Sequence, residues 1–190
     1  MAFEGGTEPR VGRAQLAVVS VLLVAVGATV AFGWPRVLDR EHGIDAMTTL
    51  GRIARGAAVY YVKPRGDKDG VRMRCQFPQG LTRSTPAKSC CDPQVNLPGT
   101  PYCDPAKTMW DTTIWKTVGV EVQDPQPFVF EYQAKGELGE ARYVVRAYGD
   151  LDCDGTMSTF EFVGTGDPDA TPENCVLRTT PVFRSDAVGE

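Results

Sequence analysis

The strongest constraint on this chain is an uncharged apolar run near its start. Residues 14–34 read AQLAVVSVLLVAVGATVAFGW and contain no charged side chain. A helix of this length spans roughly 30 Å, which matches the hydrocarbon thickness of a lipid bilayer. We therefore expect a short cytoplasmic N-terminus over residues 1–13, a transmembrane helix over 14–34, and a domain beyond the membrane.

A cleaved signal peptide is the alternative interpretation of the same run. The apolar core of a signal peptide is about 7–15 residues long and ends at a small-residue motif of the A-x-A type. Here the run is longer, and only Ala28 and Ala31 approximate such a motif near its end. The length therefore favours a retained anchor.

The cysteines indicate which side of the membrane the domain faces. All six follow the apolar run: Cys75, Cys90, Cys91, Cys103, Cys153 and Cys175. An even number without a metal-binding spacing is typical of disulfides, which form in an oxidising compartment. We therefore expect a disulfide-stabilised extracytoplasmic β-domain over residues 63–190.

The pairing of these cysteines can be predicted only in part. Cys90 and Cys91 are expected to bond different partners, because a bridge between neighbours is strained. The alternative is one pair with two free thiols. Cys153 is expected to bond Cys175, which follows it in the C-terminal segment.

An amphipathic helix is predicted directly after the apolar run, over residues 35–62. Apolar residues recur there at steps of three and four, which is the period of one helix face. This stripe consists of Ile44, Met47, Leu50, Ala54, Ala57 and Tyr61. The opposite face carries Arg40, Glu41, Asp45, Arg52 and Arg55. We expect one long helix from about residue 14 to 62, bent at Pro35 and ended by the sequence KPRG at 63–66.

The later part of the chain has the alternating pattern of β-strands. Short alternating stretches include Val118 to Val122, Phe128 to Gln133 and Tyr143 to Ala147, with a hairpin turn expected at 136–139. The predicted fold class is α+β, with the long helix packed on a small antiparallel sheet. The aromatic residues expected between helix and sheet are Tyr60, Tyr61, Trp110 and Trp115.

Residues 150–161, DLDCDGTMSTFE, match the spacing of a calcium-binding loop. The predicted oxygen ligands are Asp150, Asp152, Asp154, Thr156, Ser158 and Glu161, with Gly155 at the sharp turn. Both flanks look like strands, so a fixed structural Ca²⁺ is expected rather than a helix–loop–helix sensor. The alternative is an acidic turn that binds nothing specific.

Taken in order, these parts resemble a type IV pilin-like protein, also called a pseudopilin in type II secretion. The resemblance covers about residues 14–165. It is carried by the apolar helix ending at Pro35, the continuation MTTLGRIARGAAVYYV, the cysteine-bearing loop, the small sheet and the stretch AYGDLDCDGTMSTFEF. The chain departs from the family in two places: Gly12 precedes Arg13 instead of a phenylalanine or methionine, and the apolar run contains no glutamate.

The resemblance implies a minor or atypical structural subunit of a type IV pilus or of a type II secretion pseudopilus. Such a subunit would lie in the bacterial inner membrane, with its C-terminal domain in the periplasm or, in a filament, outside the cell. Its expected partners are other pilin-like subunits, the assembly machinery and, through residues 14–34, membrane lipid. Two alternatives remain: a monomeric membrane-tethered calcium-binding module that recognises a ligand without polymerising, and a secreted enzyme with a cleaved signal.

The sequence offers little support for enzymatic chemistry or nucleic-acid binding. His42 is the only histidine, and no phosphate loop, zinc signature or nucleophile elbow occurs. A net charge of −4 without a basic cluster argues against nucleic acid, whose binding depends on neutralising phosphates. We therefore expect neither catalysis nor a nucleic-acid partner.

Overall fold

The computed structural model describes residues 18, 22, 24, 43–67, 70–72, 75–82, 84–107, 110–177 and 182–186. Two compact units make up the chain, Met1–Glu41 and His42–Glu190, and the second carries the fold described below. Residues 1–13 and His42 lie outside the described residues. So does the predicted transmembrane helix over 14–34, apart from Val18, Leu22 and Val24, which are helical and exposed. No helix among the described residues is both long and apolar enough to cross a bilayer.

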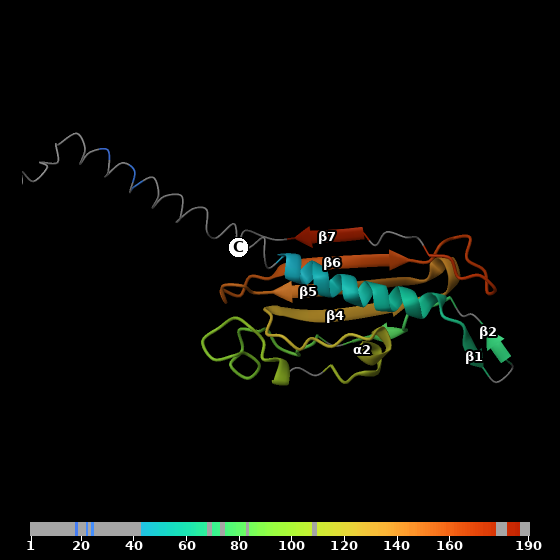
Figure 1. Cartoon of the computed structure of the whole chain (residues 1–190), viewed down its shortest axis with the longest axis horizontal. Coiled ribbons are helices and arrows are strands. Elements are labelled where there is room, and N and C mark those ends of the chain that lie inside the picture. The colour runs from blue at the N-terminus through green and yellow to red at the C-terminus, as the bar shows by residue number, and fades with distance from the viewer. Residues whose placement is uncertain are drawn as a thin grey trace, which may run out of the picture. The chain divides into compact units, whose positions relative to one another are not determined.

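An antiparallel sheet of five strands forms the centre of the second unit, in the order β3-β4-β5-β6-β7 (Figure 1). Its strands are β3 (Gly80–Leu81), β4 (Phe128–Lys135), β5 (Arg142–Gly149), β6 (Ser158–Thr165) and β7 (Val182–Asp186). A separate hairpin pairs β1 (Arg65–Asp67) with β2 (Gly70–Arg72), and the short helices are η1 (Pro105–Lys107), α2 (Thr113–Val118) and η2 (Leu138–Glu140). The predicted α+β class with an antiparallel sheet is confirmed.

Residues 43–62 are helical and lie across one face of the sheet (Figure 1). The helix buries Ala46, Leu50, Ile53, Ala54, Ala57 and Tyr61 in one core with inward residues of β4, β5 and β6. The prediction that this face includes Leu50, Ala54, Ala57 and Tyr61 is therefore confirmed. It is wrong for Ile44 and Met47, which are exposed. At about 100° per residue, Ile44 lies on the side opposite Ala46 and Ile53, and Met47 lies at the edge of the buried face, about 100° from Ala46.

The strand alternation predicted for β4 and β5 is confirmed, and so is the turn between them. Phe128, Phe130 and Tyr132 face the core from β4, and the chain turns through η2 before β5 begins. A strand at Val118 to Val122 is wrong. Val118 is the last residue of α2, and the backbone N–H of Val120 donates to the Trp115 carbonyl at the end of that helix, 3.1 Å away. Both valines are buried, so the alternation marks core contacts without a strand.

Three of the four aromatic residues expected between helix and sheet lie in the core. Tyr61, Trp110 and Trp115 are buried, whereas Tyr60 is only half-buried. Trp115 is held by its indole N–H, which donates to the hydroxyl of Thr85 at 3.0 Å. Its ring packs against Trp110 with 5.1 Å between centroids.

All six cysteines form disulfides: Cys75–Cys175, Cys90–Cys103 and Cys91–Cys153. The prediction that Cys90 and Cys91 have different partners is confirmed. The predicted pair Cys153–Cys175 is wrong. Strand β6 lies between the loop that holds Cys153 and the segment that holds Cys175, and its eight residues extend about 26 Å along the sheet.

Two buried tyrosines predict how stability changes in alkali. Tyr132 and Tyr143 stack with centroids 6.2 Å apart, and burial raises the pKa of Tyr143 to about 12. The unfolded chain loses this proton near pH 10, whereas the folded chain keeps it until about pH 12. The stabilisation that comes from this difference is therefore fully present well below pH 10 and is lost as the pH rises towards 12. Relative to pH 8, we expect Tyr143 to reduce the free energy of unfolding at pH 11 by about 1.4 kcal/mol.

Urea unfolding at pH 8 to 11 measures this decline, with Tyr143→Phe as the comparison. The variant keeps the ring but cannot ionise, so its decline should be shallower over the same range. Equal slopes in the two proteins would show that Tyr143 is not responsible.

Candidate functional site

The candidate metal site is the acidic loop between β5 and β6. It begins at Asp150, directly after the last residue of β5, and turns through Cys153 and Gly155, which both have positive φ (63° and 93°). The loop is closed by carboxylates that accept from backbone N–H groups. Asp150 accepts from Gly155 at 3.2 Å, Asp152 from Asp154 at 3.1 Å and Asp154 from Thr156 at 2.6 Å.

This folding brings three of the predicted ligands together. One carboxylate oxygen each from Asp150, Asp152 and Asp154 lies within 4.8 Å of the others. Oxygen atoms that share a Ca²⁺ each lie about 2.3–2.6 Å from it, so this separation is compatible with a common cation. Hydrogen bonds from the hydroxyl and the backbone N–H of Thr156 lower the pKa of Asp154, which favours its charged form.

Asp150 provides the observation that points most directly to a cation. Its side chain is only 6% exposed, and within the described structure its buried Oδ1 atom has no hydrogen-bond partner. A buried carboxylate oxygen without a partner is costly. A hard cation held by Asp150, Asp152 and Asp154 would offset that cost, so the donor set fits Ca²⁺.

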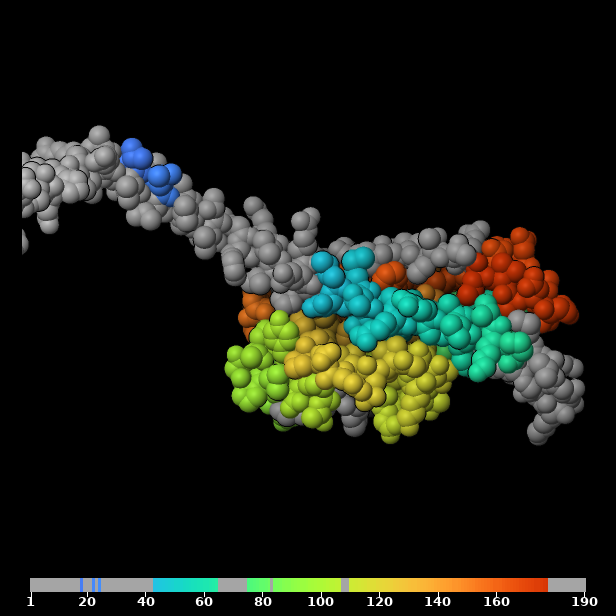
Figure 2. Space-filling view, viewed as in Figure 1, coloured from blue at the N-terminus to red at the C-terminus, as the bar shows by residue number. Residues whose placement is uncertain are grey.

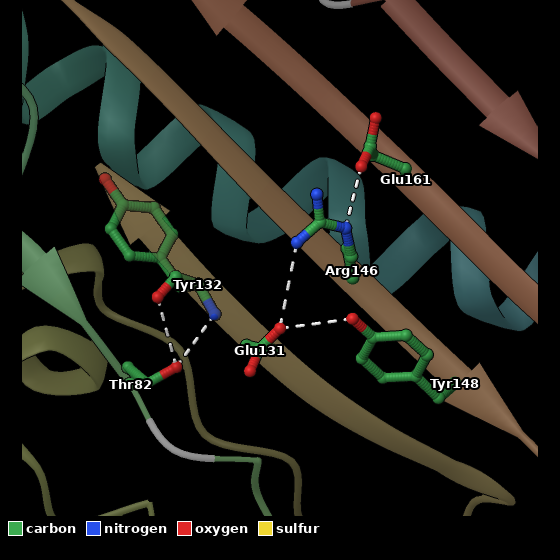
Figure 3. Close-up of polar contacts among 6 residues, drawn as sticks. All are labelled: Thr82, Glu131, Tyr132, Arg146, Tyr148 and Glu161. Atoms are coloured by element: carbon green, nitrogen blue, oxygen red, sulfur yellow. Dashed lines mark hydrogen bonds and ion pairs between the residues drawn. The ribbon is translucent and has the colours of Figure 1, made fainter. Parts of the chain in front are cut away.

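The other predicted ligands lie in different surroundings. Ser158 is buried at the start of β6 opposite Gly149, and Thr156 is exposed in the loop. Glu161 is not brought to the aspartates. It lies further along β6, where its Oε2 accepts from Nε of Arg146 at 2.7 Å (Figure 3).

Arg146 lies between two carboxylates on the sheet face opposite the long helix. Besides Glu161, it approaches Glu131 at 3.8 Å, and the hydroxyl of Tyr148 donates to Glu131 at 3.1 Å (Figure 3). At the edge of the same view, the Thr82 hydroxyl accepts from the backbone N–H of Tyr132 at 2.8 Å, which joins the segment after β3 to β4. The charged cluster was not anticipated, although strand alternation in β6 places Glu161 on this face.

The disulfide Cys91–Cys153 ties the acidic loop to the segment that precedes η1. Cys153 lies between two of the clustered aspartates, and the Sγ atom of Cys91 lies 3.2 Å from the carbonyl oxygen of Asp150. The loop is therefore fixed at its tip as well as at its strand ends.

A second candidate surface is the outward side of the long helix. Four large apolar side chains are exposed there: Ile44 (57%), Met47 (42%), Val59 (59%) and Val62 (40%). Gly51 lies on the same side, since a Cβ added to it would meet no atom within 4 Å. We call these five residues the outer helix face. In Figure 2 the helix lies uncovered on the near side of the domain.

Comparison with known proteins gives no match to a family model, to a curated protein or to a solved structure.

Proposed function

We propose that this chain is a minor or atypical structural subunit of a type IV pilus or of a type II secretion pseudopilus. Residues 14–34 hold it in the bacterial inner membrane, with the disulfide-bonded domain in the periplasm or, after assembly, outside the cell. Its partners are related subunits and the membrane assembly machinery. It needs no catalytic centre and no nucleic acid for this role.

The observation that carries the proposal is that the helix is apolar on two sides. One side is used by the sheet, where Leu50, Ile53 and Ala57 are completely buried. The outer helix face remains exposed, with one pair of large apolar side chains at each end (Ile44 and Met47, Val59 and Val62). Such side chains in water favour association with another apolar surface. A subunit that packs through its helix requires such a second face, whereas a monomeric domain does not.

The test is to place charges on the outer helix face of the full chain. The double variant Met47→Glu, Val62→Glu should keep the domain's free energy of unfolding within about 0.5 kcal/mol, because both positions are exposed and neither lines the groove between the helix and residues 117–120. It should no longer be recovered in filaments sheared from cells that express the assembly system. Leu81→Glu is the control, since Leu81 is also an exposed large apolar residue but lies in β3 at the sheet edge.

Filaments that incorporate the double variant as well as the unaltered chain would contradict the proposal. Mass spectrometry of the mature N-terminus adds a second readout. A start after Gly12 supports pilin-type processing, whereas a start near Phe32 means that the anchor is removed and the subunit role fails.

The second candidate function is that of a monomeric, membrane-tethered calcium-binding module. The buried Asp150 carboxylate favours a bound calcium ion whether the chain is a subunit or a monomer. If Ca²⁺ binds the aspartates, a concentration 100 times its Kd stabilises the fold by about 2.7 kcal/mol. We therefore expect a higher melting temperature in Ca²⁺ than in chelator. The double variant Asp152→Ala, Asp154→Ala should lose that difference.

Two further variants make the calcium test specific. Asp169→Ala removes an exposed carboxylate outside the loop and should keep the full response to Ca²⁺. Glu161→Gln distinguishes two forms of the site. If the three aspartates alone bind Ca²⁺, the variant keeps the response. If Glu161 leaves Arg146 to become the twelfth-position ligand, the variant loses part of it. Equal melting temperatures of the unaltered chain in Ca²⁺ and in chelator would exclude a structural calcium.

A further inference from the structure

A basic groove runs beside the second half of the long helix. It lies between the helix and residues 117–120 and has a volume of about 720 Å³. Its floor is apolar, with Val59, Val118 and Val120, while Arg52, Arg55 and Lys63 line it with positive charge. Among the described residues, none that lines this groove is acidic. Within the described part of the chain, neither Arg55 nor Lys63 forms an ion pair.

An acidic loop lies on the other side of the same helix, in the segment that follows β6. Residues 167–174 read DPDATPEN and carry three carboxylates, Asp167, Asp169 and Glu173, without a cation. The loop is held by backbone hydrogen bonds from Ala170 to Asp167 (2.9 Å) and from Asn174 to Thr171 (3.0 Å), and by the adjacent disulfide Cys75–Cys175. Asp169 and Glu173 are exposed.

The groove and the loop lie at the same level along the helix but on opposite flanks. A Cβ added to Gly166, the residue before Asp167, would lie 2.7 Å from the hydroxyl of Tyr61, and Tyr61 is only two residues from Lys63. Residues 117–120 form the end of α2 and the turn after it, on the β3–β4 side of the helix, whereas residues 167–174 lead from β6 towards β7. Figure 2 shows this arrangement, with the helix between the yellow segment and the red loop.

We propose that the basic groove binds the 167–174 loop of a second copy of this chain. Two copies with parallel helices, side by side at one level, bring the loop of one to the groove of the next without an axial shift. The contact joins two different surfaces, so it repeats from copy to copy and builds an open or closed array instead of stopping at a dimer. This inference rests on the proposed subunit role and names the lateral contact within it.

Zero-length carbodiimide cross-linking of the full chain in lipid vesicles tests the contact directly, because the reagent joins an amine to a carboxylate that touches it. A mixture of ¹⁴N- and ¹⁵N-labelled chains identifies cross-links between copies. The expected product joins Lys63 of one copy to Asp169 or Glu173 of another. Its yield should fall as salt is raised, since salt screens exposed charges.

Charge reversal supplies the functional arm of the test. Arg55→Glu with Lys63→Glu, or Asp169→Lys with Glu173→Lys, should each weaken self-association about tenfold or more, because like charges then face each other. The chain carrying all four substitutions should associate again. Lys135→Glu with Arg142→Glu, two exposed cations paired across β4 and β5, is the control and should leave association unchanged.

The outcomes separate this inference from the proposed function. Cross-links between copies that omit Lys63 and the loop, or a fourfold variant that stays dissociated, overturn the groove–loop contact and leave the subunit role in place. No cross-link between copies under any condition also overturns the groove–loop contact, whereas the subunit role is decided by recovery of the chain in sheared filaments.

Discussion

Removing the disulfide Cys75–Cys175 is expected to lower the free energy of unfolding by about 4.7 kcal/mol, the value for a loop of about 100 residues. These cysteines are separated by 100 residues, the longest of the three separations. The bond therefore restricts the unfolded chain more than the others do. The change to make is Cys75→Ala with Cys175→Ala, and urea unfolding measures the loss.

The matched control is the shortest disulfide, Cys90–Cys103. Its cysteines are separated by 13 residues and are also buried, so replacing both by alanine removes a similar amount of buried surface. Because its loop is short, this disulfide restricts the unfolded chain less and stabilises the fold by only about 3 kcal/mol. The first double variant should thus be less stable than the second by about 2 kcal/mol. Equal losses would show that loop size does not control the contribution of these bonds.

This disulfide pattern shows where sequence reasoning reaches its limit. Adjacent cysteines cannot easily bond each other, so separate partners for Cys90 and Cys91 followed from local geometry. The rest of the pairing did not, because six cysteines allow 15 connectivities and only the fold selects among them. Proximity in sequence suggested Cys153–Cys175, whereas the length of β6 keeps these two residues apart.

The helix shows a second limit. Its period was readable from the spacing of apolar residues, but apolar residues occur on two sides of it. Period alone therefore could not tell which side faces the sheet, and Ile44 and Met47 were assigned to the core although they are exposed. The choice depends on how closely the helix approaches its neighbours, which is a tertiary property.

The candidate metal loop, residues 150–161, was predictable where its geometry is local and not where it depends on the sheet. Asp150, Asp152 and Asp154 come together because hydrogen bonds between near neighbours close the turn. Glu161 is different, since its position is determined by the register of β6 with β5, in which it is paired with Arg146. A linear spacing rule contains no information on that register.

The substitution Gly56→Ala tests how closely the helix packs and is expected to cost about 3 kcal/mol, at the upper end for overpacking a core. A Cβ atom at this position would lie only 1.9 Å from the carbonyl oxygen of Val118 and 2.8 Å from its carbonyl carbon. Both atoms belong to the backbone at the end of α2, so no side-chain rotation can relieve the clash. The helix and α2 must move apart, which exposes core around the fully buried Trp115.

Gly51→Ala is the matched control in the same helix, because it makes the same chemical change five residues earlier. A Cβ at Gly51 meets nothing within 4 Å, so only the backbone effect remains. Replacing a glycine in a helix interior by alanine stabilises the helix by about 0.5–1 kcal/mol. The two variants should therefore move the urea midpoint in opposite directions. A small loss at Gly56, comparable in size to the gain at Gly51, would mean that the helix does not pack against α2 at this distance. The position of the basic groove between them would then have to be reconsidered, since Gly56 and Val118 both line it.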